Sequence, residues 1–464
     1  MHLLATVLRG RRIAVRRGFL IRSAVLLSLA PSLAPSLAPA QAPRSPQEAG
    51  AVVETMTLTL AEARALAMRQ NPELSATRID IDIARGTLRQ ATTPRFNPTV
   101  DLLGIGTGGS NTELGVGQEI EIGGQRNLRR RSAQAELDRS TFTTNDATRV
   151  LLANVDRAFY QLFASSRRVE LSQEVLTLNV RLNEVAQRQL REGEVSKLEY
   201  NLAVIELGRS RSRNVAAQRD RENALLDLRR LFGMTSRTMI TTVVDTAHRH
   251  VKLDSLGTPV QTADSLSVGG VTLDALTALA LSRRPDLRAN GATTERAAAE
   301  VALAERATLP NLIVRGVMEG VGSSGGAVFR PGVGLSLPVF NRNRGEVDAR
   351  RAAARQAELD RTSTTQRIRS EVEFAVRAFN AATTEVEILE STVLAPAREN
   401  RQLLEAAYRE GKVGLSVLLL IRNQVIDAEQ EYWSAWLAER EALAALGAAT
   451  GENIETLTKG NGND

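Results

Sequence analysis

The chain has no cysteine, only 3% aromatic residues, and short apolar runs. Without cysteine, it has no disulfide to stabilise an exported fold and no thiol to accept a lipid. After residue 42, no segment has the roughly 20 uninterrupted apolar residues that a membrane-spanning helix requires. The run Val417–Ile421 is much too short. Contact with a bilayer core would therefore have to be made by strands.

Histidine is also scarce, which bears on catalysis. His2 lies near the N-terminus, and His248 and His250 form a lone pair in a polar segment, which is weak evidence for a metal site. No phosphate loop, and no nucleophile with a base at a recognisable spacing, is present. The glycines of Gly104–Gly106 and Gly322–Gly326 lie in or between expected strands rather than before helices, unlike dinucleotide loops. We predict no enzymatic activity, no cofactor and no metal ligands.

Residues 1–42 are typical of a signal peptide. Six arginines precede the apolar run Ser23–Ala30, and small residues at Ala38–Ala42 offer a cleavage site. The alternative is a disordered basic arm, but the order basic, apolar, small is the one that export requires. Removing the leader leaves the chain close to neutral, so its net charge of +6 gives no support for nucleic-acid binding.

The rest of the sequence contains a long internal repeat. Thr59, Pro72 and Leu74 recur 213 residues later, and Gln134–Arg139 returns unchanged as Gln356–Arg361. A period above 200 residues is too long for a solenoid and indicates that one large unit was duplicated. We predict a first repeat over residues 43–240, a linker or equatorial segment over 241–270, a second repeat over 271–450, and a disordered tail over 451–464.

Each repeat contains a region whose apolar residues alternate. Between Thr112 and Ile122 the odd and even positions differ in polarity, as in a strand with one apolar face. The weaker partner strand is Val100–Ile105, within a strand region 97–124. The second repeat shows the pattern at Leu312–Val321 and Val333–Phe340, within 312–340. Two strands per repeat are expected.

Each repeat also predicts a very long helical hairpin. Residues 126–190 and 346–409 have helical patterns, the second broken only by Pro396. Apolar residues seven apart, such as Val155 and Leu162, indicate the seam of supercoiled helices. Return helices over 197–232 and 415–449 are shorter, so we expect the first to stack end to end with a helix over 73–93.

The fold class expected is mainly α with a small β part. Four amphipathic strands cannot close a barrel, and an open sheet edge is not tolerated in lipid. The smallest single-chain bacterial barrels have about eight strands. Three copies would supply a 12-stranded β-barrel above an α-helical barrel, which predicts a homotrimer if the strands enter a membrane.

The sequence resembles the TolC-like outer-membrane efflux proteins over roughly residues 55–452. The most specific stretch, Val333–Gly345, is similar to the strand-to-long-helix junction of that family. Its counterpart is Val116–Arg126, whose Gly-Gly-Gln-Arg end is similar to the cobalt–zinc–cadmium branch. The resemblance implies a trimeric exit duct in the outer membrane that reaches into the periplasm. It also implies a periplasmic adaptor, an inner-membrane pump and heavy-metal cargo.

The resemblance further implies that the two hairpin turns dock the adaptor. The expected docking residues are Gly193, Val195 and Ser196 in the first repeat and Gly411, Val413, Gly414, Leu415 and Ser416 in the second. The alternative for both turn glycines is plain helix termination, which needs a left-handed residue.

Acidic side chains are candidates for lining the pore. Glu405 stands where family members carry an acid near the tip, and its first-repeat counterpart is Gln187. Three copies of Glu405 would form a cation-attracting ring, although a solvated helix charge is the simpler interpretation. Glu113, Glu119 and Glu121 are interpreted as polar side chains that keep the lumen of the expected barrel hydrated.

Two other functions stay open. One is a duct for organic compounds or for type I protein secretion. The other is a periplasmic coiled-coil scaffold without a pore, which explains the long helices but not the alternating strands in both repeats. The scarcity of aromatic residues weakens the barrel hypothesis, because membrane barrels usually carry aromatic girdles.

Overall fold

The computed structural model describes residues 56–104, 113–234, 240–243, 267–320, 326–337, 340, 342–410 and 412–452. Over these residues the chain is mostly helical with a small β part, as the sequence predicts. None of the described helices combines the length and the apolar character needed to cross a membrane. His248 and His250 lie outside the described residues, as do residues 1–55 with the expected signal peptide.

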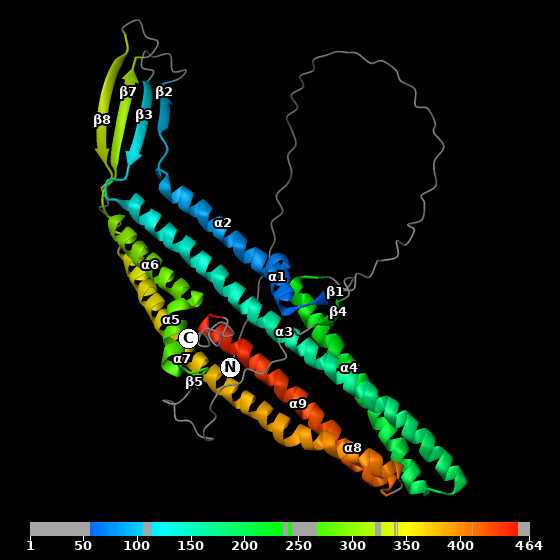
Figure 1. Ribbon diagram of the computed structural model, residues 1–464. Helices are drawn as coiled ribbons and strands as arrows, with labels where there is room; N and C mark the ends of the chain where they lie inside the picture. The colour runs from blue at the N-terminus through cyan, green and yellow to red at the C-terminus, as the bar shows by residue number, and fades with distance from the viewer. Residues whose placement is uncertain are drawn as a thin grey trace, which may run out of the picture. The chain divides into compact units, whose positions relative to one another are not determined.

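The first half runs from a short strand to a long hairpin (Figure 1). Its elements are β1 (Met56–Leu58), α1 (Leu60–Gln70), α2 (Pro72–Thr92), β2 (Thr99–Leu103), β3 (Glu113–Ile120), α3 (Gln125–Glu192), α4 (Lys197–Phe232) and β4 (Ile240–Val243). The 68 residues of α3 correspond to roughly 100 Å at 1.5 Å per residue. The chain therefore carries its sheet and its hairpin turn far apart.

The second half follows the same order with one interruption. Its elements are β5 (Ser267–Val268), β6 (Val271–Thr272), α5 (Leu273–Arg283), α6 (Pro285–Arg306), β7 (Leu312–Glu319), β8 (Val328–Leu335), α7 (Arg344–Ile388), the π-helix η2 (Leu389–Leu394), α8 (Ala395–Arg409) and α9 (Leu415–Thr450).

The helix predicted over 346–409 runs through α7, η2 and α8 without a gap, and it departs from α-helical geometry just before Pro396. The irregularity is the six-residue π-helix that precedes α8. Pro396 has no N–H to donate, and its ring crowds the carbonyl four residues earlier. A π-turn widens the backbone at that place, so the helix continues through the proline with altered hydrogen bonding.

The helices pack in parallel rows. One face of α3 contacts α2 and α4, and another contacts α6 and α9, which in turn pack on α7. The two outer rows are therefore α2 with α4 and α7 with α8. Where α4 ends, Gly233 adopts φ +67 and lies against Pro72 at the start of α2. The expected end-to-end arrangement of α2 and α4 beside α3 is thus the observed one.

Buried apolar residues explain why these rows hold together. Val155 and Leu162, seven residues apart in the first repeat, are buried, and so are Val372, Phe379 and Val386, which have the same spacing in the second repeat. The first pair lies in a core shared with both tryptophan side chains of α9. The seam predicted from the sequence spacing is therefore part of the core at these positions.

The segment predicted as a linker between the halves contains short paired strands at both of its ends. β4 pairs in parallel with β1, and β5 pairs with β6 in a short hairpin. The first strand and the start of the predicted linker thus belong to one two-stranded sheet. Residues 244–266 lie outside the part of the chain that the structure describes.

Candidate functional sites at the sheet and the hairpin turns

The four long strands form one antiparallel sheet in the order β2-β3-β7-β8. The central pair, β3 with β7, joins the two halves of the chain, and Val116 lies opposite Gly316. β8 begins at Val328, five residues before the expected Val333, because Pro331 hides the strand in the sequence. Proline is tolerated there since β8 is an edge strand in this sheet.

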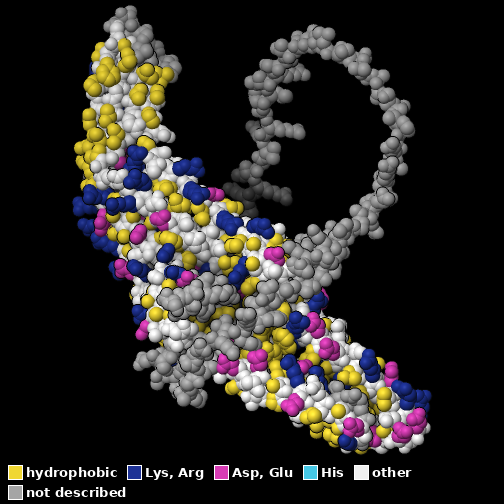
Figure 2. All heavy atoms as spheres, in the orientation of Figure 1, with side chains coloured by type: hydrophobic (Ala, Val, Ile, Leu, Met, Phe, Trp, Pro, Cys, Tyr) yellow, Lys and Arg dark blue, Asp and Glu magenta, His cyan; other side chains and the backbone are white. Residues whose placement is uncertain are grey.

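The register places apolar side chains on one face of the sheet. Aligned positions on the four strands share that face: Val100, Leu102, Leu114, Val116, Ile120, Leu312, Val314, Met318, Phe329, Val333 and Leu335. Val333 is 75% exposed and Val116 is 51% exposed. Figure 2 shows the apolar side chains gathered over these strands. The other face carries the charged residues Asp101, Glu113, Glu119, Arg315, Glu319 and Arg330.

Two exceptions on the apolar face are accommodated locally. Gln118 donates from Nε2 to the carbonyls of Phe96 and Glu119, at 2.9 and 2.8 Å, so its amide hydrogens are satisfied. Gly316 lies under the ring of Phe329, whose Cε2 would be 2.8 Å from an added Cβ. Glycine is therefore required beneath the ring, and the apolar surface is continuous across it.

The first hairpin turn is short and capped at both helix ends. Gly193 ends α3 in the left-handed conformation at φ +78. Ser196 begins α4 with a capping box in which its side chain and that of Glu199 exchange hydrogen bonds with backbone N–H groups. Gly193 and Ser196 are exposed, and Val195 is half-buried. Gly193 thus ends the helix α3 and is also exposed on the surface of this turn.

The second turn begins differently. Gly414 precedes α9 with φ −79 and no side-chain cap. Val413 is half-buried and Ser416 is exposed, whereas Gly411 and the side chain of Leu415 lie outside the described residues. The two turns therefore differ in how their following helices are capped.

The structure brings the two turns together. Val413 and Tyr408 of the second hairpin pack against a cluster that includes Ala186 and Ala203 of the first. Burial raises the pKa of Tyr408, and the carboxylate of Glu199 on α4 raises it further. The docking residues expected from each half therefore share one end of the helical hairpins (Figure 1).

The structure describes the side chains of three of the four acidic residues that were candidates for lining the pore. Glu405 belongs to α8, but its side chain lies outside the described residues. On the polar face of the sheet, Glu119 accepts a hydrogen bond from Asn311 at 2.7 Å. Glu121 is paired with Arg129, and Glu113 stands opposite Glu319. Among the described residues, no acidic or histidine cluster is arranged to hold a metal ion.

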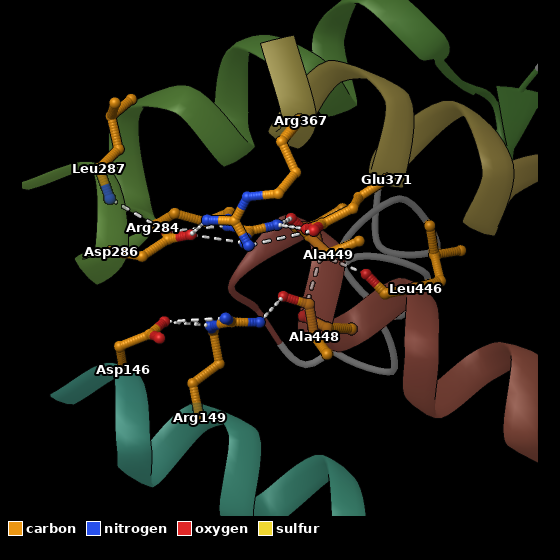
Figure 3. A network of polar contacts seen from close by, with 12 residues as sticks. Asp146, Arg149, Arg284, Asp286, Leu287, Arg367, Glu371, Leu446, Ala448 and Ala449 are labelled. Atoms are coloured by element: carbon orange, nitrogen blue, oxygen red, sulfur yellow. Dashed lines mark hydrogen bonds and ion pairs between the residues drawn. The ribbon is translucent and has the colours of Figure 1, made fainter. Parts of the chain in front are cut away.

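A buried arginine network was not anticipated from the sequence (Figure 3). Arg284, only 1% exposed, donates to both oxygens of Asp286 at 3.0 and 2.7 Å and also to Glu371. It reaches the carbonyl of Ala449 at 3.3 Å, near the end of α9. Arg149 of α3 donates to the neighbouring carbonyl of Ala448 at 2.6 Å. The network ties α3, α6, α7 and α9 together.

The first half has a counterpart of this junction. Asn71, which also precedes a helix-starting proline, donates to the carbonyl of Leu231 near the end of α4 at 2.9 Å. Each half thus uses the residue before its proline to satisfy a carbonyl near the end of its return helix, which otherwise lacks a partner. The recurring Pro72 and Pro285 were the available sequence signal.

The network predicts an acid-sensitive contribution to stability. Burial alone would raise the pKa of Asp286, but hydrogen bonds and charge from Arg284 lower it more, so it lies below the ordinary 3.8. A depressed folded-state pKa stabilises the protein above the ordinary pKa, and that contribution is lost as pH falls through the folded value. Asp286→Asn should therefore reduce the free energy of unfolding at pH 6, and its difference from wild type should shrink below about pH 4.

Urea denaturation of the detergent-solubilised protein across pH 3–7 measures this difference. Asp82→Asn, which removes an exposed pair with Arg85, is the control and should change little at any pH. A deficit for Asp286→Asn that stays constant down to pH 3 would contradict the assigned coupling.

The long hairpins and exposed sheet define the fold class of TolC-like channels. The chain is similar to a solved membrane protein from Pseudomonas aeruginosa, at 19% identity and a TM-score of 0.68, over 85% of this chain and 90% of the other. The CmeC outer membrane channel of Campylobacter jejuni gives 16% identity and a TM-score of 0.67, over 86% and 88%.

The sequence assigns the chain more closely. The model of the outer membrane efflux protein family matches residues 63–234 and 276–452, and the chain belongs to that family. The family resemblance predicted from the sequence is thereby confirmed. The protein is an outer-membrane channel component rather than an enzyme.

Three relatives have names that state a metal resistance or an exported compound. The cobalt-zinc-cadmium resistance protein CzcC of Cupriavidus metallidurans is 22% identical, over 82% of this chain and 84% of its own length. The nickel-cobalt-cadmium resistance protein NccC of Alcaligenes xylosoxydans xylosoxydans is 26% identical, over 77% and 78%. The pyoverdine export outer membrane protein OpmQ of Pseudomonas putida is 27% identical, over 74% and 70%.

Proposed function

We propose that three copies of this chain form the outer-membrane exit duct of a tripartite efflux system that exports heavy-metal cations. The observation that carries the proposal is the four-stranded sheet with one exposed apolar face, one charged face and an edge on each side. Such a sheet suits a wall between lipid and water, and it disfavours a scaffold without a pore.

The edges of the sheet require partners. Among the described strands, β2 and β8 each have a single neighbour, and backbone groups left open at an edge are costly in lipid. A head-to-tail contact between β2 of one copy and β8 of the next closes into a ring. Three copies give twelve strands, within the range of known membrane barrels.

The helices support the same ring. α2 leads into the edge strand β2, and β8 leads into α7, so each outer row of helices lies on the side of one sheet edge. The outer rows carry large exposed apolar side chains: Ile79, Ile83, Val215, Leu226, Leu359, Phe374 and Leu403. A neighbouring copy would cover both sets, which favours an α-helical barrel continuous with the strands.

The shared end of the two hairpins suits docking of an adaptor. Ser196, Gly414 and Ser416 are exposed there, and the cluster around Val413 fixes the two turns as one unit. The matching order of elements in both halves supports an origin by duplication and pseudo-symmetric contacts. An inner-membrane pump would supply the energy for export.

Metal cargo rests on the names of CzcC and NccC and on the Gly-Gly-Gln-Arg junction before α3. The similarity to OpmQ favours organic compounds as the second candidate. The duct itself need not recognise its cargo chemically. Growth assays on both classes of toxic compound separate the candidates.

A deletion strain tests the function. We expect lower tolerance to zinc, cobalt, cadmium or copper, restored by the wild-type gene but not by Gly414→Trp. That substitution leaves the backbone unstrained, because the nearest atom to an added Cβ is Ser416 Oγ at 4.0 Å, but it places a large ring on the docking surface. Gly291→Trp, in α6 with open space around it, is the control and should restore tolerance.

Native mass measurement of detergent-extracted membranes checks assembly in parallel. All variants should give trimers in the outer-membrane fraction. A monomer in the soluble fraction would refute the duct. Trimers with unchanged metal tolerance, but increased sensitivity to organic compounds, would refute the metal cargo alone.

A further inference from the structure

A cavity of about 510 Å³ lies between the two halves of the chain. Arg64 of α1 and Arg149 of α3 line it from the first half, and the α5–α6 junction and the end of α9 line it from the second. Leu152, Leu443 and Ala444 add apolar wall. The cavity has no part in the wall, the edges or the turns discussed above.

Arg440 is the unusual residue of this cavity. It is 3% exposed, and its Nε and Nη2 are buried without a hydrogen-bond partner. Its guanidinium stacks 5.3 Å from the ring centre of Trp436 and 6.0 Å from that of Tyr160. Stacking stabilises the cation but leaves the donor edge unused, and buried donors without a partner are destabilising.

The other arginines at the cavity are already neutralised. Arg64 is paired with Asp156, Arg149 with Asp146, and Arg283 with Glu452. No carboxylate of the described residues lies within ion-pair distance of Arg440. The cavity therefore contains one cation that lacks an acid.

The unused donors of Arg440 are the pair that this protein uses elsewhere to hold carboxylates. Arg64 binds Asp156 through Nε and Nη2, both at 2.7 Å. Arg139 binds Glu136 in the same way, at 2.9 and 2.6 Å, as does Arg284 with Asp286. This edge of the guanidinium matches the two oxygens of a carboxylate.

We propose that the cavity is a binding site for a small carboxylate with an apolar body, held by Arg440. The carboxylate takes the Nε and Nη2 donors; because both atoms are buried in the structure, binding requires the Arg440 side chain to rotate toward the cavity. The apolar body lies against Leu152, Leu443 and Ala444. Because both halves line the cavity, a bound ligand stabilises their contact.

Tryptophan fluorescence of the full-length protein in detergent tests the site. The chain has only two tryptophans, and Trp433 lies 5.6 Å from Trp436, so the signal reports this region. Hexanoate should change the emission saturably at pH 7.5, whereas hexanamide, its neutral analogue, should not. Arg440→Gln should abolish the response, and Arg440→Lys should weaken it at least about tenfold because lysine lacks the fork.

Two controls separate a ligand site from general effects. Arg398→Gln removes an exposed arginine paired with Glu429 at 3.8 Å and should leave the response intact. Ala444→Leu fills the cavity while retaining Arg440, and should abolish binding even if Arg440→Gln fails to fold.

Other outcomes overturn the proposal. Equal responses to hexanoate and hexanamide would mean apolar filling without carboxylate recognition. A response to inorganic phosphate as strong as that to hexanoate would remove the role of the apolar body. A response that appears only after truncation at Glu452 would assign the cavity to the chain's own C-terminal segment.

Discussion

Arg284→Ala is expected to lower the free energy of unfolding by about 3–5 kcal/mol, the range for removing one member of a buried ion pair. The change leaves Asp286 and Glu371 without their shared cation and the Ala449 carbonyl without its donor. The side chain is fully buried, so water cannot replace it without opening the junction. Urea denaturation in detergent measures the loss.

Arg367→Ala is the matched control. Arg367 contacts the same two carboxylates, at 3.1 and 3.4 Å, but is 54% exposed. Solvent screening limits such a pair to about 0–1 kcal/mol. If both substitutions cost the same small amount, the network does not hold the helices together.

Val333→Arg is expected to block assembly in the outer membrane. Arginine on the lipid face of a membrane barrel costs about 2–4 kcal/mol at mid-depth, and a trimer would carry the change three times. Val333 stands on the apolar face opposite Val314. The amount of trimer in outer-membrane fractions measures the effect, and we expect almost none.

Gly334→Arg tests the opposite face at nearly the same depth. Gly334 lies beside Val333 on β8, opposite Ile313, and an added Cβ meets only an ordinary contact at 3.8 Å. Because this face carries the charged residues, trimer yield should stay near wild type. Loss of trimer in both variants would show that the two faces do not differ in environment.

The sequence predicted most of the helical framework, because a segment such as 126–190, which has no glycine or proline and has apolar residues seven apart, allows few alternatives. It also predicted the alternating strands, whose period of two is unambiguous between Thr112 and Ile122. It missed the true start of β8, because Pro331 argues against a strand unless the strand is known to be an edge. The sequence did not predict the π-helix, because the presence of Pro396 does not indicate which change in backbone geometry accommodates the proline.

The turns and the buried network differ in how they could be predicted. Gly193 is conspicuous, because a left-handed residue is needed to end a helix there. The network of Arg284 depends on residues 87 and 165 positions away in the chain, and single-sequence patterns do not report such separations. Arginine is almost never fully buried unless it is paired, so the residue type of Arg284 gives no indication that tertiary packing buries it.

The pairing of β3 with β7 has a consequence for the order of folding. Glu119 and Asn311, which meet across this pair, are 192 residues apart. Contacts of such high sequence separation form late and slowly. The β2–β3 hairpin is therefore synthesised long before β7, and until then it has an uncovered apolar face and an unpaired edge. Cells that make this protein must keep that hairpin from aggregating during the delay.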